Sequence, residues 1–269
     1  GANPVSLYYG GSIDQVRIFN TVLTQSQVNE LARGAEYNGT SSNVTYVKPG
    51  YTGRNNDGTI ESQVSANQDA GFSVVQYTGN GSASQTYGHG LSNKPSLIIT
   101  KKTSGSQNWT VWHEDLTSDN YFLYLNTDAA EGDGVATVFN SGISTSLVGI
   151  GNSGLVNDSG QDYISYCFAS ISAYSKIGSY SGTGATNNIT GLGFEPRWVL
   201  IKCTDSGGTN WQIWDSARTT GYNLFPNLAI GEVDNSSTFT GFTADGFTVA
   251  GTSGSANASG STYLYMAFA

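Results

Sequence analysis

The sequence predicts an all-β protein built from two tandem β-sandwich repeats, and two features of the chain lead to this prediction. Glycine supplies 35 of the 269 residues, proline only 5, and aromatic residues make up 12% of the chain. Glycine permits the positive φ angles of tight turns, and aromatic side chains suit the pleated surface of a strand. Short apolar runs alternate with clusters of Gly, Asn, Asp and Ser, which is typical of short strands in a sandwich.

The second feature is an internal repeat. Segments 71–174 and 175–269 carry the same landmarks in the same order, about 100 residues apart. The matching pairs are Tyr77-Thr-Gly-Asn-Gly with Tyr180-Ser-Gly-Thr-Gly, Trp109-Thr-Val-Trp112 with Trp211-Gln-Ile-Trp214, and the Gly154–Gly160 run with the Gly254–Gly260 run. Each copy holds about seven strand-like runs, so we expect two jelly-roll-like sandwiches.

Each copy also contains two tryptophans three positions apart, which cannot share a face of a regular strand. Strand alternation therefore places Trp109 and Val111 on the inward face, with Trp211 and Ile213 as their counterparts in the second copy. It places Trp112 and Trp214 nearer the other face. One tryptophan of each pair is then expected to be exposed or at the end of a strand.

The N-terminal part has a different pattern. Residues 8–20 alternate like a strand, and a short helix is expected after them, with Thr24 as its N-cap, Gln27 in the capping-box position and Gly34 at its end. Residues 35–70, rich in Gly, Asn, Ser and Thr, are expected to form a connector with at most short strands. Because the chain starts at Gly1 without a methionine, we expect it to be part of a longer precursor.

The charge and hydropathy of the chain exclude two kinds of partner. The formal net charge is −9, which would repel a phosphate backbone, so we expect no nucleic acid partner. No run approaches the roughly 18 apolar residues of a membrane span, so no membrane insertion is expected. Cys167 and Cys203 both lie in apolar strand-like runs, where a free cysteine packs as a small hydrophobic side chain.

No residue pattern points to catalysis. The run from His113 to Asp115 is the densest polar cluster, but the second copy has Asp215-Ser-Ala there, so we interpret it as an exposed strand end. Nucleophile elbows, HExxH, CxxC and phosphate-binding loops do not occur in the sequence. We therefore predict a protein that is not an enzyme and has no catalytic, cofactor or metal site. Calcium binding through the acidic runs 115–119 and 128–133 is left open.

Exposed aromatic side chains offer one candidate binding site. Their planar faces can stack on the C–H groups of sugar rings. The candidates are Trp112, Trp214, Tyr87 and Tyr124. The alternative, which we favour, is that the aromatic residues fill the cores and subunit interfaces.

Two stretches resemble known families. The stretch from Gly11 to Leu31 resembles the closing strand and helix of a laminin-G-like, concanavalin-type jelly roll, of which residues 1–34 would be the C-terminal end. Most of residues 44–269 resembles a repeat-containing domain of unassigned function in tail and other structural proteins of marine bacteriophages. The residues that carry this resemblance are Gly71-Phe-Ser-Val-Val-Gln-Tyr-Thr-Gly, Gly88-His-Gly-Leu, Tyr166-Cys-Phe-Ala, Asp215-Ser-Ala-Arg218 and Tyr265-Met-Ala-Phe-Ala269.

The phage resemblance implies a structural role on the virion surface, as a tail fibre or a head decoration. The implied partners are other virion proteins, further copies of the chain in a homo-oligomer (a trimer is favoured) and a host surface glycan. The alternative is a bacterial extracellular adhesin or filament subunit that binds carbohydrate at the cell surface. A glycan-degrading enzyme would need two carboxylates about 5–10 Å apart, and the repeats share no acidic pair.

Overall fold

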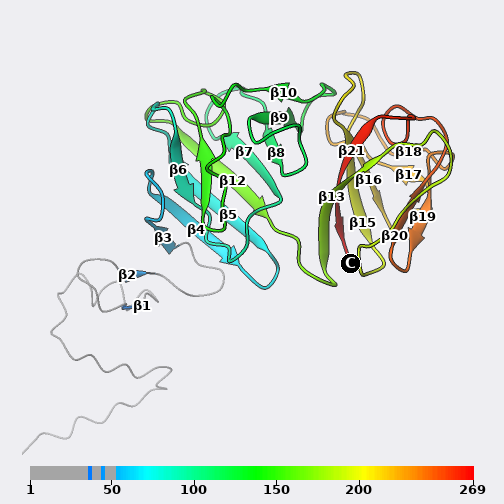
Figure 1. Ribbon diagram of the computed structural model, residues 1–269, viewed down its shortest axis with the longest axis horizontal. Helices are drawn as coiled ribbons and strands as arrows, with labels where there is room; N and C mark the ends of the chain where they lie inside the picture. Colours follow the sequence, from blue (N-terminus) through cyan, green and yellow to red (C-terminus); the bar gives the residue numbers. More distant parts are fainter. Residues whose placement is uncertain (1–35, 38–43, 46–52) are drawn as a thin grey trace, which may run out of the picture.

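The computed structural model describes residues 36–37, 44–45 and 53–269, and every regular element in these residues is a β-strand (Figure 1). The all-β prediction is therefore confirmed for this part of the chain. The strand expected at residues 8–20 and the helix expected after it lie outside the described residues. Ahead of the first sandwich, β1 (Glu36–Tyr37) pairs with β2 (Val44–Thr45).

The first sandwich is formed by residues 53–168. The strands of its large sheet are β3 (Gly53–Asn55), β4 (Ser62–Asn67), β5 (Phe72–Thr78), β7 (Leu97–Lys102), β8 (Thr110–His113), β9 (Tyr121–Tyr124), β10 (Gly132–Asp133) and β12 (Asp162–Phe168). They form an 8-stranded sheet in the order β10-β9-β8-β7-β12-β5-β4-β3. A second layer consists of β6 (Gln85–Gly88) paired with β11 (Leu147–Ile150).

The second sandwich is formed by residues 175–268. Its strands are β13 (Ser175–Ser181), β14 (Asn187–Ile189), β15 (Trp198–Cys203), β16 (Gln212–Asp215), β17 (Tyr222–Asn223), β18 (Val233–Asp234), β19 (Phe239–Thr243), β20 (Gly246–Val249) and β21 (Thr262–Phe268). One layer has the order β13-β21-β15-β16 and the other has the order β14-β20-β19. The short pair β17 and β18 joins the edge of the first layer through a bridge between Ile213 and Leu224.

The same strand order occurs in both sandwiches, as the repeated landmarks predict. The order β8-β7-β12-β5 of the first corresponds to β16-β15-β21-β13 of the second, with antiparallel pairing throughout. The first sheet is larger because β4 pairs along β5 and β3 pairs with β4. Part of the expected connector thus belongs to the first sheet, and the proposed domain limits at 34, 70 and 174 stay predictions.

The paired tryptophans do point to opposite faces, but not as expected. Trp112 and Trp214 fill the interiors of the two sandwiches. Val111 and Trp211 lie on the other face and are buried as well, because that face packs against the neighbouring repeat. The expected inward face is therefore wrong. Alternation separates the two faces of a strand but does not say which of them faces the interior of the sandwich.

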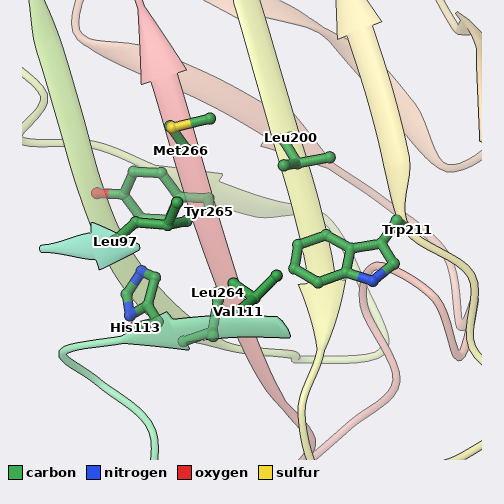
Figure 2. A pocket seen from close by; sticks show the side chains of 8 residues that line it. All are labelled: Leu97, Val111, His113, Leu200, Trp211, Leu264, Tyr265 and Met266. Atoms are coloured by element: carbon green, nitrogen blue, oxygen red, sulfur yellow. The ribbon is translucent and has the colours of Figure 1, made fainter. Parts of the chain in front are cut away.

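The two sandwiches pack directly against each other through the outer faces of their large sheets (Figures 1 and 2). One continuous apolar cluster joins Leu97 and Val111 of the first sandwich to Leu200, Leu264 and Met266 of the second. A sheet that carries apolar side chains on both faces must cover both of them. The inter-repeat contact covers part of each outer face and packs the two repeats against each other.

The inter-repeat contact is asymmetric. The loop between β9 and β10 reaches the second sandwich, where the Glu131 amide donates to the Thr204 carbonyl oxygen at 2.7 Å. The corresponding loop of the second sandwich, between β17 and β18, instead exposes Leu228 and Ile230, at 40% and 54%. The two repeats therefore use different parts of equivalent surfaces.

The repeated landmarks build the same turn structure in each sandwich. The side chain of buried Asn157 accepts a hydrogen bond from the Asn80 amide and donates to the carbonyl oxygens of Ser82 and Gly151, each at 2.8 Å. Asn257 makes the corresponding bonds in the second repeat. One buried asparagine thus satisfies three backbone groups in two turn segments, which would otherwise lack partners.

A buried tyrosine completes each turn structure. The Tyr163 hydroxyl accepts a hydrogen bond from the Asp158 amide at 2.8 Å and donates to the Gly154 carbonyl oxygen at 2.9 Å. Tyr263 makes both bonds at the same distances in its own repeat. The motif that identifies the repeat in the sequence is therefore a structural motif.

Both cysteines are free and buried. Cys167 lies among the apolar side chains of the first core, and burial raises the pKa of its thiol to about 12. Cys203 lies in the core of the second sandwich. The prediction that both pack as hydrophobic side chains is confirmed.

Candidate functional site

Three of the four aromatic residues expected to stack on sugars lie inside the sandwiches. Trp112 and Tyr87 are both 0% exposed and Trp214 is 1% exposed. The Tyr87 hydroxyl donates to Ser165 Oγ at 2.9 Å, and burial raises the pKa of Tyr87 well above its usual value. A ring without an exposed face cannot meet a sugar, so these three assignments are wrong.

The fourth candidate, Tyr124, is partly exposed at the end of β9. Its ring stands edge-on to the Phe122 ring, with centroids 5.2 Å apart. Its carbonyl oxygen accepts a hydrogen bond from Trp211 Nε1 at 2.9 Å, across the inter-repeat contact. Contact of Tyr124 with a glycan stays a prediction.

His113 is not the exposed residue that the sequence predicts, because it is 1% exposed at the contact between the repeats (Figure 2). Its Nδ1 accepts a hydrogen bond from the Asp115 amide at 3.0 Å, so the proton of the neutral ring lies on Nε2. Among the described residues, Nε2 has no hydrogen-bond partner. Burial lowers the pKa of His113 to about 4, against the opposing effects of Asp115 and the Tyr265 backbone.

The neighbours of His113 do not make an acid–base centre with it. Glu114 and Asp115 are exposed, whereas His113 is buried. The Asp115 amide already occupies His113 Nδ1, and the ring has no exposed surface at which to reach a substrate. The His113–Asp115 run is therefore a structural feature of the inter-repeat contact.

A small cavity lies beside His113 between the two sandwiches (Figure 2). Its other lining residues come from both repeats and are Leu97, Val111, Leu200, Trp211, Leu264, Tyr265 and Met266. The cavity has a volume of about 10 Å³, which is at the lower limit for one water molecule. It leaves no room for a substrate.

Carboxylates of the acidic loops accept hydrogen bonds from neighbouring loop residues. The Glu131 carboxylate accepts hydrogen bonds from the amide and the hydroxyl of Thr117, and Asp133 accepts one from the Val135 amide at 2.7 Å. Within residues 53–269 and the two short strands before them, no three His, Cys, Asp or Glu side chains are grouped to hold a metal ion. The described part also contains no helix with the length and hydropathy of a membrane span.

The outer face of the first large sheet carries aromatic residues that the sequence did not single out for binding, among them Phe168, which packs against Phe268 of the second repeat. We call Phe72 on β5, Tyr166 on β12 and Trp109, just before β8, the aromatic row; all three are partly exposed. The ring planes of Phe72 and Tyr166 are 4° apart, with centroids at 6.5 Å. Those of Tyr166 and Trp109 are 20° apart, with centroids at 6.4 Å.

Polar side chains border the aromatic row. The strand register places Gln63, Gln76 and Lys101 in the cross-strand row next to that of Tyr166 and on the same face. The two glutamines are exposed and Lys101 is partly exposed. The face therefore combines aromatic rings with amide groups that both donate and accept hydrogen bonds.

The matching face of the second sandwich is not free. Leu200 and Met266 pair across β15 and β21 as Ile99 and Tyr166 pair across β7 and β12. Leu200 and Met266 line the cavity and pack against the first repeat (Figure 2). Of the two equivalent residue pairs, Leu200 and Met266 are buried between the repeats, whereas Ile99 and Tyr166 stay partly exposed.

Comparison with protein families identifies the kind of chain. The model of a domain of unknown function, DUF7483, matches residues 17–269. The chain belongs to this family.

The DUF7483 match includes both repeats and begins inside the stretch that resembles a laminin-G-like domain. The description of the family assigns it no activity. No curated protein and no solved structure matches the chain.

Sequence reasoning missed the aromatic row of this DUF7483 chain for a specific reason. On β12, Tyr163 and Cys167 point inward, whereas Ile164 and Tyr166 alternate with them on the outer face. Both faces of the strand are apolar, so alternation cannot say which aromatic residues are exposed. The signal that was available is a comparison of the repeats, because Met266 replaces the aromatic Tyr166 where the face is buried.

Proposed function

We propose that this DUF7483 chain is a non-enzymatic structural protein of a bacteriophage particle, at the virion surface as a tail fibre or a head decoration. The observation that supports a structural role is the use of the repeated motif. Asn157, Tyr163 and their counterparts in the second repeat form hydrogen bonds within turns. None of them lines the cavity between the repeats.

The packing of the repeats supports the same role. Outer faces that are buried against each other, with a backbone hydrogen bond from Glu131 to Thr204, make the tandem a stiff spacer. A stiff spacer holds a contact surface away from the particle at a defined distance. A hinged pair of domains would not do so.

The phage assignment rests on the resemblance of residues 44–269 to domains of phage structural proteins. The laminin-G-like interpretation of residues 1–34, the partnership with other virion proteins and the trimeric state belong to the same proposal. A second candidate function is a bacterial extracellular adhesin or filament subunit that binds carbohydrate. The partly exposed aromatic row supports the carbohydrate binding by which this second candidate is defined.

Immunogold labelling tests the proposal. Antibody is raised against residues 53–269 and applied to purified particles of the phage and to uninfected cells of its host. Gold on tails or fibres supports an attachment role, and gold over heads supports decoration. Gold on uninfected cells and on no particle would reject the virion role in favour of the adhesin.

The non-enzymatic part of the proposal has its own test. The purified chain is incubated with neutral and acidic polysaccharides, and reducing ends are measured over time. We expect no release above that of heat-denatured protein. Steady release of reducing sugar by the native protein would show that the chain is a glycan-degrading enzyme.

A further inference from the structure

We propose that the aromatic row of Phe72, Tyr166 and Trp109 binds an extended, neutral oligosaccharide. The inference deepens the proposed surface role, on which it rests, by naming a binding face and the class of its ligand. The sequence-based candidates Trp112, Trp214 and Tyr87 are buried, whereas the rings of the aromatic row have exposed surface that a sugar can reach.

The orientation of the rings is the first argument. The plane of the Tyr166 ring lies within 4° of that of Phe72 and within 20° of that of Trp109. The three rings are therefore close to parallel, and centroid spacings of 6.5 Å and 6.4 Å bring neighbouring rings within reach of one oligosaccharide. Sugar C–H groups stack on aromatic faces through dispersion and the ring quadrupole.

The polar border is the second argument. Exposed Gln63 and Gln76 lie in the cross-strand row beside that of Tyr166. An amide side chain donates and accepts, as a sugar hydroxyl does, so the two groups are complementary. The net charge of −9 disfavours an acidic polysaccharide, which makes the expected ligand neutral.

The third argument is the small exposed area of the aromatic row, which favours a glycan over a protein as the ligand. The exposed surface of the aromatic row comes from three side chains that are each only partly exposed. A stable protein interface needs about 800 Å² from each partner. In the second repeat the equivalent face carries the aliphatic Leu200 and Met266 and is covered by the first repeat of the same chain. The aromatic version of the face suits a thin ligand.

The test is binding of the full chain to neutral oligosaccharides. Glucan, galactan and mannan oligosaccharides are printed on an array, and any that retain the protein are then titrated in solution. We expect Tyr166→Ala and Trp109→Ala each to weaken binding about threefold to tenfold. Tyr166→Phe, which keeps the ring, should bind like the wild type.

Two further variants keep the result interpretable. Gln76→Ala alters an exposed amide, leaves the cores untouched and should weaken binding a few-fold. Tyr174→Ala removes a ring that is 43% exposed but lies outside the aromatic row, so it should leave binding unchanged. Thermal unfolding of each variant shows that it is folded. The absence of binding to every neutral probe, or binding that Tyr166→Ala and Gln76→Ala leave intact, would overturn the inference.

The glycan-binding test and the immunogold test can reject the binding site and the virion role independently of each other. Gold on virions without glycan binding would reject the aromatic row as a site and keep the structural role. Glycan binding lost in Tyr166→Ala, with gold only on uninfected cells, would keep the site and reject the virion role.

Discussion

At the scale of single residues, two buried ionisable side chains lie close to the contact between the repeats. His113 keeps an unpaired Nε2–H inside it. Lys202, which is 0% exposed, donates from Nζ to the carbonyl oxygen and the hydroxyl of Thr209 at 2.8 Å and 3.0 Å. Burial lowers the pKa of Lys202 to about 8. Both residues are more costly to charge in the folded chain than in the unfolded one.

The His113 pKa predicts acid sensitivity. The unfolded chain binds a proton here below pH 6.5, whereas the folded chain does so only near pH 4, so wild-type stability falls as the pH drops between these values. The loss reaches at most about 3 kcal/mol. His113→Asn should lack this loss, because an amide oxygen can accept the Asp115 N–H without titrating. Urea unfolding at pH 7 and pH 4.5 measures the difference, and equal losses in the two proteins would contradict the prediction.

At the scale of elements, the turn structure persists where its charged neighbours do not. In the first repeat, Lys102 forms an ion pair with Asp158 at 2.8 Å. Cys203 and Ala258 occupy the corresponding positions of the second repeat, yet the Asn257 hydrogen bonds remain. The buried asparagine, and not the half-exposed ion pair, therefore holds the turns, as expected from the small energies of surface pairs.

Removing the asparagine should expose this dependence. Asn157→Ala leaves the Asn80 amide and two turn carbonyl groups without their partner, which should cost about 3 kcal/mol of unfolding free energy. Asn80→Ala, which changes an exposed side chain of the same turn, should cost about 1 kcal/mol or less. Urea unfolding at pH 7 compares them. Similar losses for the two variants would show that the buried hydrogen bonds are not what stabilises the turns.

At the scale of the whole molecule, the repeats differ in which part of the outer face they bury. The first uses β7, β8 and the loop after β9, and the second uses β15, β21 and the residue before β16. The two sheets thus meet through surfaces that are only partly equivalent, and the aromatic row of the first sheet stays outside the contact. Asymmetric pairing is what makes a binding face available on one repeat and not on the other.

Trp211 is expected to be the main anchor of this contact. Its side chain is 2% exposed, lines the cavity and donates to the Tyr124 carbonyl oxygen. Trp211→Ala should cost about 3–5 kcal/mol and loosen the tandem, seen as a larger radius of gyration in small-angle X-ray scattering. Trp211→Phe keeps most of the packing and should cost about 1–2 kcal/mol, with the radius unchanged. An unchanged radius in Trp211→Ala would show that the other contacts suffice.

Several features of the molecule follow from the order of residues alone. Glycine-rich punctuation predicts short strands, and landmarks such as Tyr77-Thr-Gly and Tyr180-Ser-Gly predict the tandem, because equivalent turns need equivalent residues. Burial of the two cysteines also follows from local apolar context. These predictions depend on short-range patterns, which a sequence displays directly.

Which faces of the strands are buried, by contrast, is determined only by the tertiary structure. Trp112 and Trp214 were expected to lie away from the interior, and His113 was expected to be exposed, but all three are buried. Both faces of the central strands are apolar, so their periodicity is the same whether a face meets the core, the other repeat or solvent. Long-range packing of one sandwich on the other removed this ambiguity. It buried His113 and Trp211, and it left Phe72, Tyr166 and Trp109 partly exposed.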